Sequence, residues 1–208
     1  MQPAAQHSPA QTGPVRKRPK PGERRLQILQ TIASMLQEGA AEKVTTAALA
    51  AKLSLSEAAL YRHFASKAQM FEGLLDFIEE TIFSLINQIE ARPGAPAARA
   101  REIVLMLLGF AEKNPGMTRV LIGDAIVNED SRLQARVNQL LERVEASIRQ
   151  CLRLQRAEAE ASQASPELSL QSAMAMAFVQ GRWLQFAKTG FRKRPSDSAE
   201  AIVKFIFP

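Results

Sequence analysis

The chain has 208 residues, of which 46% are hydrophobic and 23% charged, enough for one large domain or a small domain joined to a larger one. Its single cysteine, Cys151, excludes an internal disulfide framework and argues against a cysteine-based zinc site. The longest apolar stretches are far below the roughly 20 residues that span a bilayer, and no apolar secretory segment opens the chain, so a cytoplasmic protein without membrane association is expected.

The charge is unevenly distributed along the chain. Residues 1–67 contain 10 lysines and arginines and 4 acidic residues, whereas residues 68–208 contain 17 of each kind. The whole net charge of +6 therefore lies in the first third, which is typical of a protein that contacts a polyanion such as nucleic acid. A basic tail without a specific partner is the simpler alternative.

Two segments open the chain. Residues 1–21 are rich in proline, glutamine and alanine and end in the basic run RKRPKP, which predicts a disordered basic tail. Apolar residues at helical spacing then predict a first helix over residues 22–38, with Gly39 as a suitable stop.

The most informative stretch is TTAALAAKLSLSEAALYRHFASK, residues 45–67. Thr45 or Thr46 can cap a short helix, and Ser56 can cap a second one after a tight three-residue connection. Glu57 falls in the first turn of the second helix, where the helix dipole favours a negative charge. Small alanines allow the two helices to cross closely, so a helix-turn-helix and a DNA-binding domain over residues 22–67 are predicted.

The rest of the chain has helical periodicity throughout. Gly, Pro and capping residues divide it into helices over residues 66–91, 96–114, 116–123, 129–160, 167–189 and 196–205. The run IVLMLLGF, residues 103–110, is apolar all round and belongs in the centre of a bundle. No segment alternates with period two, so an all-α chain of eight or nine helices is predicted, with a dimerisation and partner-binding domain over residues 68–208.

At LYRHFASK, residues 60–67, the pattern that begins at Thr45 resembles the TetR family of bacterial DNA-binding proteins. The resemblance covers residues 24–80. It implies a three-helix DNA-binding unit followed by a TetR-like helical bundle. Since one recognition helix reads few bases, a homodimer on a palindromic site in double-stranded DNA is expected.

The resemblance, taken together with residue chemistry, implies a set of candidate DNA contacts. Helix N-termini and cations suit phosphates, whereas exposed groups on the recognition helix suit base edges. Each of three residues has a simpler interpretation without DNA contact. His63 is then an ordinary surface histidine, Tyr61 a partly buried side chain, and Lys67 a solvated charge. Arg24 and Arg25 are equally compatible with ordinary helix-surface charges. The predicted set is Thr45, Thr46, Ser56, Glu57, Ala58, Tyr61, Arg62, His63, Lys67, Arg24 and Arg25.

The last two helices carry the candidate dimer interface. Their bulky apolar residues would form a four-helix seam between subunits, unless the stripe only closes the core of its own subunit. The predicted set is Met174, Phe178, Trp183, Phe186, Ile202 and Phe205.

Residues 103–125 and 130–150 resemble a nucleoid-occlusion branch of the same family. That resemblance implies a nucleoid-associated factor that binds specific chromosomal sites and, when DNA-bound, inhibits ring assembly by the tubulin-like division protein FtsZ. It points to Phe77, Met106, Gly109, Lys113 and Asn114 as partner contacts. Leu85 departs from the branch, which has a basic residue there. Gly109 is explained either by a partner's close approach or by close packing of two internal helices.

A ligand-responsive TetR-type transcriptional repressor is the alternative function. The apolar central helices show no cluster of polar groups that would line a pocket. An enzyme is not expected, because the sequence lacks a phosphate-binding glycine loop after a strand and a histidine paired with a nucleophile. The chain has only two histidines, so no metal site and no cofactor are predicted.

Overall fold

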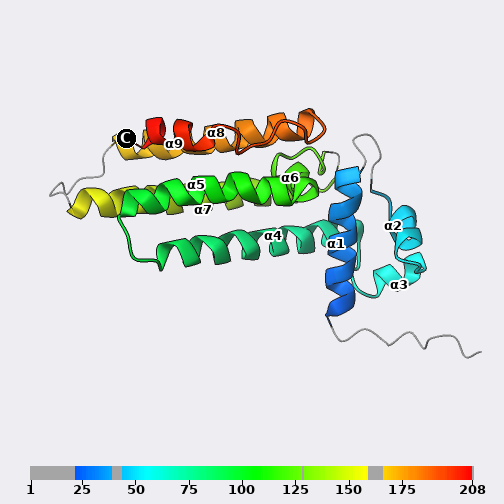
Figure 1. Cartoon of the computed structure of the whole chain (residues 1–208). Coiled ribbons are helices and arrows are strands. Elements are labelled where there is room, and N and C mark those ends of the chain that lie inside the picture. Colours follow the sequence, from blue (N-terminus) through cyan, green and yellow to red (C-terminus); the bar gives the residue numbers. More distant parts are fainter. Residues whose placement is uncertain (1–21, 39–43, 128, 159–165, 208) are drawn as a thin grey trace, which may run out of the picture.

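The computed structural model of the chain describes residues 22–38, 44–127, 129–158 and 166–207. Within these ranges the regular elements are nine helices and no strands (Figure 1). The predicted all-α fold is therefore confirmed. The basic tail predicted over residues 1–21 and the helix stop predicted at Gly39 lie outside the described residues.

The first three helices form a head at one end of the molecule (Figure 1). They are α1 (Glu23–Glu38), α2 (Thr46–Lys52) and α3 (Glu57–Tyr61). The predicted caps are present, since the Thr45 hydroxyl accepts a hydrogen bond from the Ala48 amide and the Ser56 hydroxyl accepts one from the Ala59 amide, each at 3.2 Å. The head is thus a helix-turn-helix preceded by a supporting helix.

The bundle consists of six helices, four of which are long. Ser66 caps the first of them, α4, by accepting a hydrogen bond from the Gln69 amide at 3.1 Å. The bounds are α4 (Lys67–Glu90), α5 (Pro96–Lys113), α6 (Pro115–Leu121), α7 (Ser131–Glu158), α8 (Pro166–Lys188) and α9 (Ala199–Ile206). Figure 1 shows α4, α5, α7 and α8 running side by side, with α9 next to α8.

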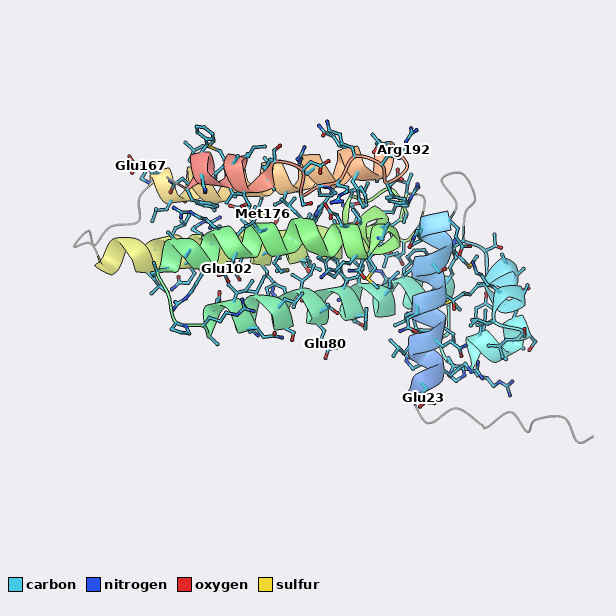
Figure 2. The ribbon with its side chains drawn as sticks, in the orientation of Figure 1. Glu23, Glu80, Glu102, Glu167, Met176 and Arg192 are labelled. Atoms are coloured by element: carbon cyan, nitrogen blue, oxygen red, sulfur yellow. The ribbon has the colours of Figure 1, made fainter. Side chains whose placement is uncertain are left out.

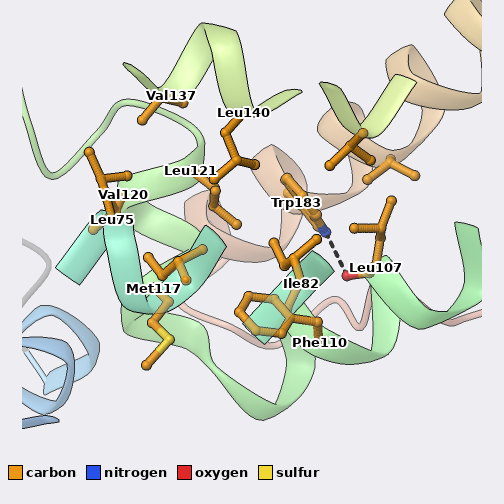
Figure 3. Close-up of a cluster of buried hydrophobic side chains, with 14 of the residues drawn as sticks. Leu75, Ile82, Leu107, Phe110, Met117, Val120, Leu121, Val137, Leu140 and Trp183 are labelled. Atoms are coloured by element: carbon orange, nitrogen blue, oxygen red, sulfur yellow. Dashed lines mark hydrogen bonds between the residues drawn. The ribbon is translucent and has the colours of Figure 1, made fainter. Parts of the chain in front are cut away.

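Helix α5 lies in the middle of the bundle, as its apolar sequence predicted, but the side with the half-buried Met106 and Gly109 is not covered by another helix. It packs against α4, α7, α8 and α9, and Ile103, Val104, Leu107 and Leu108 are completely buried. The Trp183 indole nitrogen donates a hydrogen bond to the Leu107 carbonyl at 3.1 Å, which ties α8 to α5 (Figure 3). Side chains fill the space between the helices, so this region is a solid core (Figure 2).

The head and the bundle share one continuous core. Helix α1 packs against α6 and α4, and its buried residue Ile32 belongs to the same hydrophobic cluster as the α5 residues. At the crossing of α1 and α6, a Cβ on Gly116 would lie only 1.8 Å from the Ala33 carbonyl oxygen. Gly116 follows Pro115 and reads in the sequence as a helix stop, but its main role is to let two backbones touch.

We predict opposite effects from alanine at two helical glycines. Gly116→Ala should lower the free energy of unfolding by about 1–3 kcal/mol, because α1 or α6 must shift to admit the methyl group. Gly109→Ala should raise it by up to about 1 kcal/mol, because nothing lies within 4 Å of a Cβ there and alanine favours the helix. Urea denaturation followed by circular dichroism measures both, and equal effects would contradict the close crossing.

Candidate DNA interface

The recognition helix α3 presents a small outer face. Leu60 is completely buried and Phe64 is 2% exposed, so the apolar side of the helix faces the head's core. The predicted groove residues Ser56, Glu57, Ala58 and Arg62 are all exposed, and so is Tyr61, a predicted contact to the DNA backbone. The small side chain of Ala58 keeps this face narrow enough to enter a major groove about 12 Å wide.

Two polar side chains on this face are unengaged. Tyr61 is 45% exposed, and Arg62, which caps the C-terminal end of α3, is exposed as well. Neither side chain has a hydrogen-bond or ion-pair partner in the described part of the chain. Both can therefore reach DNA without first breaking a contact within the protein.

Several other predicted DNA contacts are engaged inside the protein. The Thr46 hydroxyl donates to Glu57 Oε2 at 2.5 Å, which joins α2 to α3. Lys67 Nζ lies 2.5 Å from Glu129 Oε1, which joins the start of α4 to the segment before α7. Thr45 uses its hydroxyl as a cap. The DNA roles predicted for these residues stay predictions.

The two arginines at the start of α1 differ in their contacts. Arg24 donates to Gln27 Oε1 at 2.7 Å, one turn along its own helix. Arg25 donates to the His63 carbonyl, and its guanidinium lies 4.1 Å from the centroid of the Phe64 ring. Arg25 thus holds α1 against the end of the recognition helix, while the half-buried His63 takes part through its backbone.

The described residues contain no cluster of side chains suited to bind a metal ion. Among them, no three histidine, cysteine or acidic side chains gather as metal ligands. Cys151 is 3% exposed, and burial raises the pKa of its thiol, so it behaves as a small apolar core residue. No helix in the described ranges is long and apolar enough to cross a membrane.

The predicted partner residues lie on the outer sides of α4 and α5. Met106, Gly109 and Lys113 are spaced three and four residues apart, so they share one face of α5. Lys113 is exposed, Phe77 on α4 is half-buried, and the half-buried Asn114 donates from Nδ2 to the Phe110 carbonyl at 2.8 Å. Because nothing lies within 4 Å of a Cβ at Gly109, close packing of internal helices does not explain this glycine.

The predicted dimer residues divide into two groups. Phe205 and Met174 are 88% and 50% exposed, and Phe178 and Ile202 are half-buried. Trp183 and Phe186 are only 0% and 3% exposed, so they belong to the subunit's own core, and their assignment to the interface is corrected. The reason is geometric, because the nine residues from Met174 to Trp183 make about two and a half turns of helix, which places Trp183 on the side opposite Met174.

Sequence reasoning missed two exposed apolar residues on α8. Leu170 is 62% exposed and Leu184 is 46% exposed. With Met174 between them and the small residues Ala177 and Gly181, they follow a spacing of four, three, four and three residues. That spacing is the signature of a helix face that packs against another helix, and it was available in the sequence.

The helix-turn-helix head and the helical bundle together define a TetR-type DNA-binding protein. Residues 28–74 match the family described as "Bacterial regulatory proteins, tetR family", and residues 96–207 match the SlmA-like form of "Tetracyclin repressor-like, C-terminal domain". The chain belongs to the TetR family and, within it, to the SlmA-like group.

Full-length relatives support this assignment. The chain is similar to "Nucleoid occlusion factor SlmA" of Alteromonas mediterranea, with 46% identity over 178 residues, covering 86% of this chain and 91% of the relative. It is also similar to the protein of the same name from Escherichia coli O1:K1 / APEC, with 46% identity over 179 residues, covering 86% and 90%.

Solved structures show the same fold at low identity. The regulator FadR from Bacillus subtilis, in complex with stearoyl-CoA, has a TM-score of 0.71 and 10% identity, covering 88% of this chain and 97% of FadR. The TetR-family regulator PfmR from Thermus thermophilus has a TM-score of 0.69 and 19% identity, covering 87% and 94%. These similarities establish the fold alone.

We predict that Arg62→Ala weakens binding to a selected DNA site by about 1–3 kcal/mol, roughly ten- to hundredfold, because Arg62 is exposed and unengaged. Adding Tyr61→Ala should abolish specific binding. Fluorescence anisotropy measures affinity, and analytical ultracentrifugation checks that the oligomeric state is unchanged. Arg153→Ala, an exposed arginine on α7, is the matched control with the same charge change. Unchanged affinity in both Arg62 and Tyr61 variants would refute the assignment of α3.

Proposed function

We propose that this protein is a nucleoid-occlusion factor. It binds specific chromosomal sites as a homodimer and, when bound, inhibits FtsZ ring assembly over the chromosome, so that division waits for segregation. The observation that carries the proposal is 46% identity over nearly the full length of relatives named nucleoid occlusion factors. Such a protein works in the cytoplasm, on the nucleoid.

The DNA-binding part of the proposal is supported by the head. Its recognition helix has only five residues, so one head reads few bases and two heads on a palindrome are needed. The exposed apolar face of α8, with Phe205 on α9, supplies a surface that a second subunit would cover. The refined interface set therefore contains Leu170, Met174, Leu184 and Phe205, with the half-buried Phe178 and Ile202 beside them.

The FtsZ part of the proposal is supported by the outer face of α5. Gly109 leaves open space in the middle of a helix that is otherwise well packed. The residue lowers helix stability by about 1 kcal/mol relative to alanine. Contact with another chain at this face accounts for the lost helix stability. Met106 and Lys113 on the same face would add apolar and cationic contacts with that chain.

The alternative of a ligand-responsive repressor has less support. The centre of the bundle is filled by completely buried side chains, including Trp183, Leu107 and Ile103. A hollow of about 870 Å³ is lined by Leu105 on α5 and by residues of α9 and the turn before it, including the exposed Lys204 and Phe205. It lies at the surface, beside the proposed dimer face.

FtsZ polymer sedimentation tests the proposed function. A DNA fragment recovered by selection from random sequence is added to this protein, FtsZ and GTP. We expect fewer polymers in the pellet, with a larger effect when the selected DNA is present than with a scrambled fragment. If FtsZ is indifferent while the DNA binds tightly, the repressor alternative takes its place, and the search turns to a small ligand that releases the DNA.

We further predict that Gly109→Leu abolishes the effect on FtsZ and leaves DNA affinity unchanged. A Cβ at this position meets nothing within 4 Å inside the subunit, and the rest of the leucine side chain would obstruct a partner that approaches α5 closely. Sedimentation and anisotropy measure the two properties on the same preparations. Gln139→Leu, at an exposed position on α7, is the matched control for added surface hydrophobicity. Full FtsZ inhibition by Gly109→Leu would move the partner surface elsewhere.

A further inference from the structure

The turn between α8 and α9 carries a basic run that the proposed function does not use. Its sequence, GFRKRP over residues 190–195, places Arg192, Lys193 and Arg194 in succession, and all three are exposed. Residues 188–197 hold four cations and one carboxylate, whereas residues 68–208 as a whole contain equal numbers of each. Positive charge is thus concentrated at this turn of an otherwise balanced bundle.

Aromatic packing fixes the first half of the turn. Phe191 has a φ of 63°, in the left-handed region that residues other than glycine rarely adopt. Its amide donates to the Phe186 carbonyl at 2.8 Å, and the centroids of the two rings lie 5.1 Å apart. From α6, the buried guanidinium of Arg119 lies 5.2 Å from the centroid of the Phe191 ring. A strained residue persists only where its surroundings hold it, so the backbone that carries the cations has a defined shape.

Hydrogen bonds fix the second half of the turn against α8 and α5. Arg182 on α8 donates from Nε to the Pro195 carbonyl at 3.1 Å, and it also donates to the Asp197 carbonyl. The Ser196 amide donates to Glu112 Oε1 on α5 at 2.8 Å. The turn is therefore held at both ends, so a partner would meet cations whose backbone is already in position.

The three cations have little compensation inside the protein. Arg192 Nε donates to the Thr189 carbonyl at 2.9 Å, which is not a charged group. Arg194 Nε lies 4.0 Å from Asp197 Oδ1, and both side chains are more than half exposed. The Lys193 side chain has no hydrogen bond or ion pair in the described part of the chain. Because neighbouring like charges raise one another's energy, this arrangement favours an anionic partner.

The turn lies beside the proposed partner face of α5 and away from the recognition helix. Glu112, which accepts the Ser196 amide, directly precedes Lys113, the cation of that face. Figure 2 places Arg192 at the end of the bundle nearest the head, and Figure 1 shows α3 on the far side of α1 from the bundle. An anion that fits the turn therefore belongs to the protein bound at α5, in preference to the DNA bound at α3.

We propose that the turn of residues 190–195 binds an acidic segment of the protein that contacts α5. The inference rests on the proposed function, under which that protein is FtsZ, and it adds the chemistry of the segment that is recognised. The open space at Gly109 and the apolar Met106 accept uncharged side chains, while Lys113 and the turn pair with carboxylates further along the segment. Exposed ion pairs of this kind speed association and weaken as salt rises.

Reversal of the charge on the turn tests this inference. A variant with Arg192→Glu, Lys193→Glu and Arg194→Glu is compared with the native protein in FtsZ sedimentation, each bound to the selected DNA. The protein concentration that removes half of the polymer should rise about tenfold at low salt, because three exposed ion pairs are replaced by repulsion. The difference should shrink at high salt. DNA affinity, measured by anisotropy, should stay the same.

A single variant and a matched control separate the charge from the fold. Lys193→Glu changes a side chain without an internal hydrogen bond or ion pair, and it should raise the half-maximal concentration about two- to threefold. Arg153→Glu makes the same change of charge at an exposed position near the C-terminal end of α7 and should leave that concentration unchanged. Thermal unfolding and analytical ultracentrifugation check that each variant is folded and keeps the native oligomeric state.

Two results would overturn the inference. One is inhibition of FtsZ by the triple variant that is as strong as inhibition by the native protein. The other is a loss of DNA affinity in the triple variant as large as its loss of FtsZ inhibition, which would assign the turn to DNA.

A labelled poly-glutamate peptide separates failure of this inference from failure of the proposed function. If the native protein leaves FtsZ polymers intact, the nucleoid-occlusion proposal fails, and the peptide still reports whether the turn binds carboxylates. Weaker peptide binding by Lys193→Glu than by Arg153→Glu, measured by anisotropy at low salt, would support the inference. Equal binding by the two variants would refute it.

Discussion

The close crossing of α1 and α6 fixes the relation between the DNA-binding head and the rest of the protein. At Gly116 a side chain as small as a methyl group would collide with the Ala33 carbonyl, so backbone lies against backbone. A second glycine serves the same purpose on α4, where a Cβ at Gly73 would lie 2.9 Å from Phe64 Cε1. Arg25 covers the Phe64 ring from α1. The three-helix head is thus held against the bundle on two sides.

This attachment explains how a short recognition helix can be specific. Five residues cannot fix their own position on DNA, so the position of α3 must come from the structure that carries it. The apolar face of α8 lies on the bundle, remote in sequence from α3 but connected to it through the shared core. Two subunits joined along that face would present their heads at a fixed separation, and only sites with matching half-site spacing would bind well.

Local signals made most of the fold predictable from sequence. The caps at Thr45, Ser56 and Ser66 and the apolar periodicity of the long helices each depend on residues within one or two turns. Which side of α8 faces the core was harder to predict. Trp183 and Met174 are both apolar residues of this helix, but Trp183 is buried whereas Met174 is exposed. The role of Gly116 was not predictable, since its neighbour Ala33 is distant in the chain and belongs to another helix.

The candidate site shows why charge counted along a sequence differs from charge arranged in space. The first 67 residues hold the whole formal excess of +6, which correctly indicated a DNA-binding surface. Glu129 belongs to the balanced remainder of the chain, yet it lies against Lys67 and neutralises a cation that the count assigns to the head. Lys52 is likewise paired with Glu38, and that hydrogen bond lowers the pKa of the Glu38 carboxyl. Among the described residues of α3 and the turn after it, Arg62 is by contrast a cation without a carboxylate partner, so its charge is not offset locally.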